Sequence, residues 1–323
     1  MRKIDGEART IRELLSGARY SIDYYQREYR WQTKQVAELM DDLISRFQEE
    51  YEPNHPREAV EGYGHYFLGS IIISHKNSQN YIIDGQQRLT TLTLLLIHLH
   101  NLQKDRDDAV HDIEKMIFSQ KYGRKSFNID VEERLAVMEA IFEGEPFDDT
   151  ESPESIQNIL ARYEEIKDAL TPELTGDALP YFIDWLIENV HLVEITAYSD
   201  EDAYTIFETM NDRGLSLTPT EMLKGYLLAN ITDSQQKTRA NAKWKRTITR
   251  LVQFGKEEDS DFFKSWLRSQ RAMTIRERKK DATPGDFDRI ATEFHRWVRD
   301  KRDDLGLTHS NDFVQLIETE IDF

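Results

Sequence analysis

The stretch YIIDGQQRLTTLTLLLIHL, residues 81–99, constrains the fold more than any other part of the chain. A strand-like run ends at Asp84-Gly85, and a run dominated by leucine begins almost at once. Its apolar residues cover nearly every direction of a helix, so the predicted helix has no polar face to turn toward water. Such a helix must be surrounded by other elements, which predicts that it is deeply buried within a domain.

Polar side chains crowd the first turn of this predicted helix. Gly85 allows a sharp turn, and Gln86, Gln87 and Arg88 follow it. A helix N-terminus has unpaired N–H groups and suits an anion, while an arginine adds a bidentate phosphate donor. The glutamine amides can bind a phosphate, a base or a water. In the alternative reading Asp84 caps the helix and Arg88 forms a salt bridge, and the residues alone leave both readings open.

Length and composition indicate a globular protein that does not span a membrane. The 323 residues suffice for about two domains, and 39% are hydrophobic and 11% aromatic, enough for a core. The absence of cysteine excludes disulfides, thiolate metal sites and a cysteine nucleophile. No run approaches the roughly 18 apolar residues needed to span a bilayer, and the N-terminus lacks the apolar stretch of a signal peptide. We therefore expect a cytoplasmic protein.

The charge of the chain is unevenly distributed. A net charge of −18 argues against a protein that coats nucleic acid along its whole surface. Between Lys237 and Lys280, however, 14 Lys and Arg residues face only 5 Asp and Glu residues. This segment is either a phosphate-facing surface or a solvated helix face that balances acidic neighbours. If it binds DNA, its candidate contacts are Lys243, Lys245, Arg246 and Arg250.

Periodicity predicts a small sheet combined with many helices. Two β-rich runs, 65–74 and 79–85, indicate a hairpin, and residues 143–154 indicate an exposed loop. Further elements are a strand at 190–198 and a set of helices at 11–15, 33–51 with Thr33 as N-cap, 155–170, 178–189 and from Thr218, where a capping box is expected. The fold class is therefore α+β: a mixed-sheet core from residues 1–110, which strand 190–198 can join, and a mainly helical remainder.

Two more clusters are candidates for binding. In YYQREYRW, Arg27 and Arg30 stand among aromatic residues that can grip a base, a phosphate or a sugar, or simply pack on a core. In FETMNDRGLSLTPTEMLK, Asn211 and Arg213 lie at a helix end followed by a helix start, and helix-stop and helix-start rules also explain that composition. Several familiar motifs are missing: a phosphate loop, G-x-G-x-x-G, H-E-x-x-H, metal-ligand spacing among the histidines, and a histidine pair for an HNH nuclease.

Together, YYQREYRW, YFLGSIIIS…YIIDGQQRLTTL and FETMNDRGLSLTPTEMLK resemble the N-terminal domain of GmrSD-type, modification-dependent restriction proteins. The resemblance covers about residues 10 to 230 and implies a ParB/sulfiredoxin-like core. It also implies domains at 1–232 and 233–323, the second a helical region that can lead to an effector domain. In that family the D-G-Q-Q-R motif is associated with binding and hydrolysis of a nucleoside triphosphate, commonly GTP. Its members act against phage by recognising modified DNA.

The resemblance assigns expected roles to individual residues. Asp84, Gln87 and Arg88 would be catalytic. The expected nucleotide contacts are Gly85, Gln86, Thr90, the YQR element Tyr25, Gln26 and Arg27, and the downstream Asn211 and Arg213, which match the family motif together with Gly214. The expected DNA contacts are Arg27, Arg30, Lys243, Lys245, Arg246 and Arg250. No metal site made of protein ligands is expected. Asp23 and Glu28 stand where the family usually has prolines.

The function predicted from these observations is a nucleoside-triphosphate-binding and hydrolysing sensor of a phage-defence restriction system, with GTP or another triphosphate and, as an option, Mg²⁺. The alternative is a non-enzymatic, nucleotide-gated DNA-binding adaptor that recruits a nuclease. A ParB-type partition or transcription factor is disfavoured by the acidic net charge and the missing helix-turn-helix signature. The expected partners are double-stranded DNA, modified phage DNA in particular, and a nuclease domain or subunit, because no segment up to Phe323 resembles one. A homodimer is also compatible with the sequence.

Overall fold

The computed structural model describes residues 5–22, 28–76, 79–121, 124–197, 206, 218–255, 257–275 and 284–321. The chain forms two compact units, one of residues 1–23 and 27–198 and one of residues 24–26 and 199–323. The helix that follows Thr218 belongs to the second unit, and the domain boundary expected after residue 232 stays a prediction. The two units are described separately.

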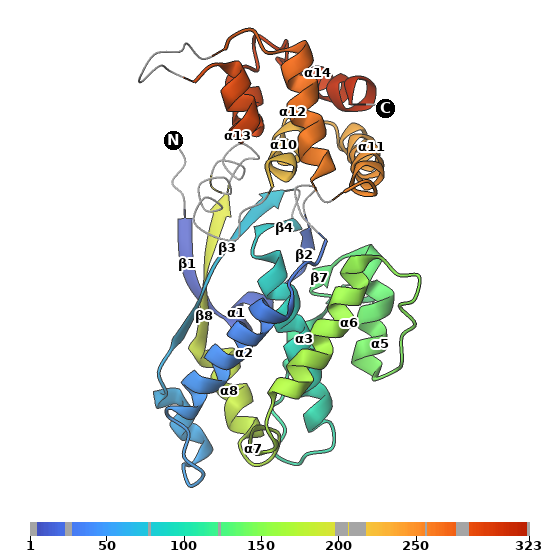
Figure 1. Ribbon diagram of the computed structural model, residues 1–323. Coiled ribbons are helices and arrows are strands. Elements are labelled where there is room, and N and C mark those ends of the chain that lie inside the picture. The colour runs from blue at the N-terminus through green and yellow to red at the C-terminus, as the bar shows by residue number, and fades with distance from the viewer. Residues whose placement is uncertain are drawn as a thin grey trace. The chain divides into compact units, whose positions relative to one another are not determined.

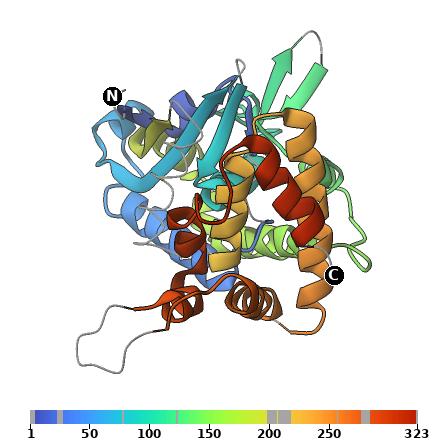
Figure 2. The same ribbon diagram turned by 90° about the horizontal axis from the view of Figure 1, so that it is seen from above.

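A six-stranded mixed sheet organises the first unit (Figure 1). Its strands, in spatial order, are β1 (Asp5–Thr10), β8 (Val190–Ala197), β3 (Tyr66–Lys76), β4 (Gln79–Asp84), β2 (Tyr20–Ile22) and β7 (Ile129–Asp130). The β1–β8 and β3–β4 pairs are antiparallel, whereas β8–β3, β4–β2 and β2–β7 are parallel. The strand predicted at 190–198 thus joins the N-terminal sheet. A separate ribbon, β5 (Phe118–Lys121) with β6 (Arg124–Phe127), stands apart from it in Figure 2.

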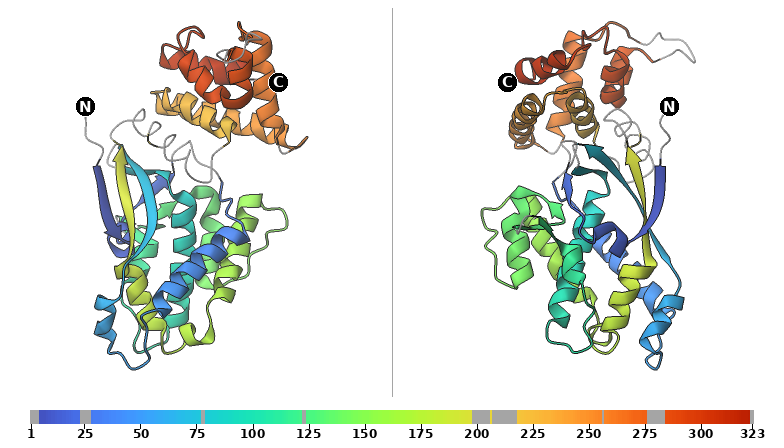
Figure 3. Two further views of the ribbon diagram at one scale, coloured as in Figure 1. Left: turned by 60° about the vertical axis from the view of Figure 1, so that its left-hand side comes forward. Right: turned by 180° about the vertical axis from the view of Figure 1, so that it is seen from behind.

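Helices pack against this sheet and bury α3 (Gln86–Gln103). The other helical segments of the unit are α1 (Ile11–Leu15), α2 (Thr33–Gln48), the 3₁₀ turns η1 (Arg57–Gly62) and η2 (Glu132–Arg134), α4 (Ile113–Ile117), α5 (Leu135–Glu143), α6 (Glu154–Ala169), α7 (Pro172–Thr175) and α8 (Leu179–Asn189). The left view of Figure 3 shows α2, α3 and α6 together on one side of the sheet. Because α3 is apolar in almost every direction, it contacts α4, α5 and α6 and is buried along most of its length, as its sequence predicts.

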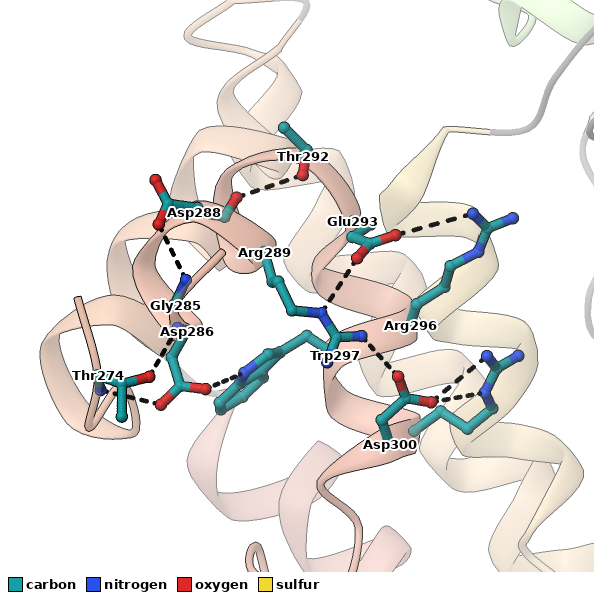
Figure 4. Close-up of polar contacts among 11 residues, drawn as sticks. Thr274, Gly285, Asp286, Asp288, Arg289, Thr292, Glu293, Arg296, Trp297 and Asp300 are labelled. Carbon is teal, nitrogen blue, oxygen red and sulfur yellow. Dashed lines mark hydrogen bonds and ion pairs between the residues drawn. The ribbon is translucent and has the colours of Figure 1, made fainter. Parts of the chain in front are cut away.

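The second unit is a helical bundle. Its described elements are α10 (Pro219–Ala229), α11 (Ser234–Val252), α12 (Glu258–Gln270), α13 (Asp286–Asp300), α14 (Ser310–Gln315) and the π-helical turn η3 (Leu316–Glu320). Trp244 of α11 stacks on Phe263 of α12 with ring centroids 5.2 Å apart, and Phe263 stacks on Phe294 of α13 at 5.8 Å. Charged side chains of α13 itself form a cluster of ion pairs and hydrogen bonds (Figure 4). These aromatic contacts make up part of the core of this unit.

Most of the predicted elements are confirmed, and the fold class is α+β with a mixed sheet. The capping box at Thr218 is present, since its hydroxyl accepts from Glu221 N and the Glu221 carboxylate accepts from Thr218 N. The prediction of Thr33 as an N-cap is wrong. Gln32 is the N-cap of α2, and the Thr33 hydroxyl instead donates to Glu165 at 2.7 Å. A ParB/sulfiredoxin kinship of the sheet stays a prediction.

Several strands carry no local sequence signal. β1 has the polar sequence DGEART and lies at the sheet edge, where its first four residues are exposed and no apolar alternation is needed. β5, β6 and β7 are two to four residues long, too short for an alternating pattern to stand out. Among the described residues, no helix is long and apolar enough to cross a membrane.

Candidate functional site

The turn from β4 into α3 can be made only by glycine. Gly85 is the N-cap of α3 with φ +93°, a conformation that side chains of L-residues rarely adopt. A Cβ atom at this position would lie 2.5 Å from Cγ2 of Ile71 on β3. Glycine therefore brings the start of α3 into close contact with the sheet. The N-cap position itself is therefore occupied by Gly85, which supplies no side-chain cap, and Asp84 precedes it at the end of β4.

Arg88 is fixed against a bulge in β3. Its Nη1 donates to the carbonyl of Ser70 at 2.8 Å, and its guanidinium lies over Gly69, where a Cβ would be 3.2 Å from Nη2. Gly69 has φ +114° at an irregularity in the β3–β8 register. Burial lowers the pKa of Arg88, and nearby Asp84 and Tyr66 raise it in part. The guanidinium is thus a half-buried cation, positioned by main chain at the end of the sheet.

Gln87 connects α3 to the segment that follows the YQR element. Its Oε1 accepts from the N–H groups of Arg30 at 2.8 Å and Trp31 at 3.2 Å, and its Nε2 donates to the carbonyl of Glu28 at 3.0 Å. Both ends of the amide are therefore engaged by main chain. The contacts give Gln87 a positioning role, and a direct catalytic role stays a prediction.

The segment 28–32 is held from a second side by α6. Asn158 donates to the carbonyl of Tyr29 at 3.3 Å, and Arg162 donates to the carbonyl of Trp31 at 3.2 Å. Tyr29 is fully buried, with its hydroxyl 2.8 Å from Oγ1 of Thr91 on α3. The D-G-Q-Q-R motif and the second half of YYQREYRW, separate in sequence, are thereby brought together.

Gln86 is the least satisfied polar residue of the motif. It is 4% exposed, and its Nε2 has no hydrogen-bond partner among the residues that the structure describes. An unpaired buried amide costs free energy comparable to a lost hydrogen bond. It lies in the first turn of α3, where N–H groups also lack intrahelical partners. Two kinds of unmatched donor therefore meet at one helix end, an arrangement suited to an anion.

One turn further along α3, Thr90 contacts an arginine that the sequence did not single out. Thr90 is 3% exposed, and its Oγ1 accepts from Nη1 of Arg134 at 3.3 Å. Burial lowers the pKa of Arg134 to about 10, an effect that Glu133 and Glu28 oppose. Both residues line the same small pocket. No local sequence signal marks Arg134, because its contact with Thr90 spans 44 residues.

Several other predicted site residues lie in segments that the structure does not describe. Tyr25, Gln26 and Arg27 of the YQR element, and Asn211, Arg213 and Gly214 of the downstream motif, lie outside the described residues. Asp84 ends β4 and is half-buried, and Arg30 is exposed next to the segment that Gln87 holds.

The predicted DNA contacts of the basic segment lie on α11. Arg239, Lys243, Arg246 and Arg250 recur at spacings of three and four residues and so share one face of this helix. Arg239, Arg246 and Arg250 are exposed, as is Lys245, which points to a different side of the helix. The cationic row extends over about 16 Å of helix length.

The fold and the polar groups define the first unit as an α+β domain whose unmatched donors gather at the start of one buried helix. The family model of the GmrSD restriction endonuclease N-terminal domain matches residues 11–228, which is more than half of the chain. The chain therefore belongs to this family and is a component of a phage-defence restriction system. A comparison with curated proteins gave no match.

Proposed function

We propose that the N-terminus of α3 binds the phosphates of a nucleoside triphosphate, GTP being favoured by the family resemblance, and that the domain hydrolyses it as a sensor in modification-dependent restriction. The observation that carries this proposal is the buried Nε2 of Gln86, which has no partner among the described residues and lies at an uncapped helix start. Arg88 is fixed two residues away and supplies a cation. A phosphate would satisfy these donors together.

In this proposal, individual residues of the chain have separate roles in phosphate binding and hydrolysis. The first turn of α3 and Gln86 bind phosphate oxygens, and Arg88 stabilises the negative charge that develops during phosphoryl transfer. Asp84, at the end of β4, orients the attacking water or holds Mg²⁺. One carboxylate fits Mg²⁺, because this ion is commonly held by one or two carboxylates together with substrate phosphates and water. When bound, Mg²⁺ would neutralise phosphate charge.

A second candidate function is a nucleotide-gated adaptor without turnover. It is favoured by the hydrogen bonds of Gln87, whose amide is engaged at both ends by residues 28–31 and so is not directed at a water. In this version nucleotide binding at Gln86 and Arg88 would change the 28–31 segment through Gln87. The output would be recruitment of a nuclease rather than phosphate release.

The partners follow from the same proposal. Double-stranded phage DNA carrying a modification would contact Arg30 and the cationic row of α11, and a nuclease domain or subunit would cut it. Phosphate contacts of arginine and lysine make such binding strongly dependent on salt. We place the protein in the cytoplasm, where phage DNA and nucleotides are both present, and a homodimer is compatible with this activity.

Phosphate release from GTP and ATP tests the proposal. Wild type, Arg88→Ala and Asp84→Ala are compared with and without modified phage DNA, and nucleotide binding is measured in parallel by calorimetry. We expect wild type to bind and hydrolyse, Arg88→Ala to lose about 100-fold or more in turnover, and Asp84→Ala to bind without turnover. Binding without turnover in wild type under all conditions would establish the adaptor. Absence of binding would overturn both.

A further inference from the structure

A pocket beside the second turn of α3 contains a buried positive charge. It is lined by the polar residues Thr90, Thr93 and Arg134 and by apolar side chains that include Phe127 and Met138. Arg134 is only 6% exposed. Of these residues only Thr90 was predicted as a ligand contact, and none of them belongs to the D-G-Q-Q-R motif.

The charge of Arg134 is not balanced by an ion pair within the described part of the chain. The guanidinium forms one hydrogen bond within the described residues, the 3.3 Å bond to the Thr90 hydroxyl, which is a neutral acceptor. Arg162 is equally buried, at 6% exposure, and differs in this respect, since Nε and Nη2 each donate to the Glu165 carboxylate at 2.6 Å. Buried charges in folded proteins are normally paired, because leaving water is costly for an ion. Glu133 and Glu28 act on Arg134 electrostatically, but neither forms an ion pair with it within the described part of the chain. A buried arginine whose guanidinium is hydrogen-bonded only to a neutral hydroxyl therefore indicates an external anion.

Two polar residues of the pocket lie on the same side of α3 as Gln86. Gln86, Thr90 and Thr93 are separated by four and three residues and lie along one side of the helix. Gln86 at one end has the unpartnered Nε2, and Arg134 meets Thr90 one turn further on. One turn of helix advances about 5.4 Å, which is within the span of neighbouring phosphate groups of a polyphosphate chain. A single polyphosphate ligand could accept from both.

We propose that Arg134 is a phosphate-binding residue, and that Arg134 and Gln86 together bind adjacent phosphate groups of a polyphosphate ligand. Where that ligand is the nucleotide, the inference rests on the proposed function. The Thr90 hydroxyl accepts from the guanidinium and holds it against α3. The apolar walls exclude water and so strengthen the contact between guanidinium and phosphate.

The test compares two arginines with and without polyphosphate. Arg134→Met removes the unbalanced charge, and Arg57→Met is the control, because Arg57 of η1 is paired with Asp184 at 2.5 Å. Thermal unfolding and calorimetry are recorded without ligand, with inorganic pyrophosphate and with GTP. We expect Arg134→Met to keep or raise the ligand-free Tm, to lose the rise in Tm caused by pyrophosphate, and to bind GTP about 10- to 100-fold more weakly. Arg57→Met should lower the ligand-free Tm and keep the ligand-dependent rise.

A second variant keeps the test decisive if Arg134→Met does not fold. Thr90→Val removes the hydroxyl that holds the guanidinium and retains its shape, and should weaken pyrophosphate and GTP binding several-fold. Wild-type affinity for both ligands in Arg134→Met, or in Thr90→Val if only that variant folds, would overturn the inference while leaving the nucleotide function intact. Pyrophosphate binding that depends on Arg134, with no binding of GTP, would support the inference and contradict the proposed function. A wild type that binds neither ligand overturns both.

Discussion

The two ends of α3 each bury a glutamine, and the two side chains differ in how they are satisfied. Gln103, in the last turn, is 5% exposed, and its amide forms both bonds it can make with Val110, donating to the carbonyl at 2.9 Å and accepting from the N–H at 2.8 Å. Gln86, in the first turn, is 4% exposed, and its Nε2 lacks a partner among the described residues. A paired buried amide stabilises the fold, whereas an unpaired one is retained at a cost that a ligand can offset.

The charged side chains of α13 are paired, as Gln103 is (Figure 4). Asp286 accepts from the N–H groups of Met273 and Thr274 at 3.0 Å and from Nε1 of Trp297 at 2.9 Å. Arg289 reaches both Glu293, at 3.1 Å, and Asp300, at 2.5 Å. Among the described residues, the guanidinium of Arg134 beside α3 is hydrogen-bonded only to the Thr90 hydroxyl. Buried charges such as Asp286, whose partners are all within the fold, thus stabilise the structure, whereas a buried charge such as Arg134 is available to a ligand.

The largest effect on stability is expected from Asp286→Ala. Burial would raise the pKa of Asp286, but hydrogen bonds from Trp297, Met273 and Thr274 outweigh it and hold this pKa below its usual value. Removing the carboxylate leaves buried donors unpaired, so the free energy of unfolding should fall by about 3–4 kcal/mol in urea titrations. Asp304→Ala, which removes an exposed carboxylate paired with Lys301, should change it by less than about 0.5 kcal/mol. Equal losses in both variants would show that pairing does not make the cluster structural.

His98, also on α3, is a buried group kept neutral rather than charged. Burial lowers its pKa to about 4, with Lys167 adding to the effect and Glu164 opposing it. In the unfolded chain the pKa is about 6.5, so the unfolded state binds the proton first as pH falls. Stability is retained above pH 6.5 and lost between 6.5 and 4, by about 3 kcal/mol.

Urea titrations of wild type and His98→Gln across this pH range measure the effect of His98. The variant should lack this part of the pH dependence, because glutamine does not titrate. Parallel curves for the two proteins would mean that His98 is protonated as easily in the fold as in the unfolded chain.

Gln87→Ala should loosen the segment that connects the two motifs. The main-chain N–H groups of Arg30 and Trp31 lose their acceptor, and the fold loses about 1–2 kcal/mol. Hydrogen exchange of these two amides should accelerate, while exchange in the middle of α3 stays slow. Unchanged exchange at Arg30 and Trp31 would refute the positioning role of Gln87.

The cationic row of α11 should influence DNA binding without affecting stability. Arg246→Ala with Arg250→Ala should reduce the slope of log affinity against log salt by about 2, because each phosphate contact contributes about 0.9. The control double variant Lys34→Ala with Lys115→Ala removes two exposed lysines from the first unit, each paired with a nearby carboxylate, and should leave the slope unchanged. Equal slopes in both double variants would exclude α11 from phosphate contacts.

The sequence predicts what depends on neighbours in the chain and misses what depends on distant contacts. The leucine pattern of α3, the hairpin before it and the capping box at Thr218 are local, and all were predicted. The role of Gln87 depends on main-chain groups 56 to 59 residues away, and that of Arg134 on a threonine 44 residues away. Contacts over such separations leave no periodic pattern in the sequence. The polar residues at the start of α3 could therefore be recognised from the sequence, but the separate roles of Gln86, Gln87 and Arg134 could not.

Replacing each of the two buried glutamines of α3 by leucine distinguishes an amide that stabilises the fold from one that binds a ligand, with GTP binding followed by calorimetry and stability by urea titration. Gln103→Leu should lose about 2–4 kcal/mol of unfolding free energy, because Val110 is left unpaired, and should bind GTP like wild type. Gln86→Leu should be as stable as wild type without nucleotide and should bind GTP about tenfold more weakly. A Gln86→Leu protein that is destabilised but binds GTP with wild-type affinity would show that the Gln86 amide stabilises the fold and does not bind a ligand.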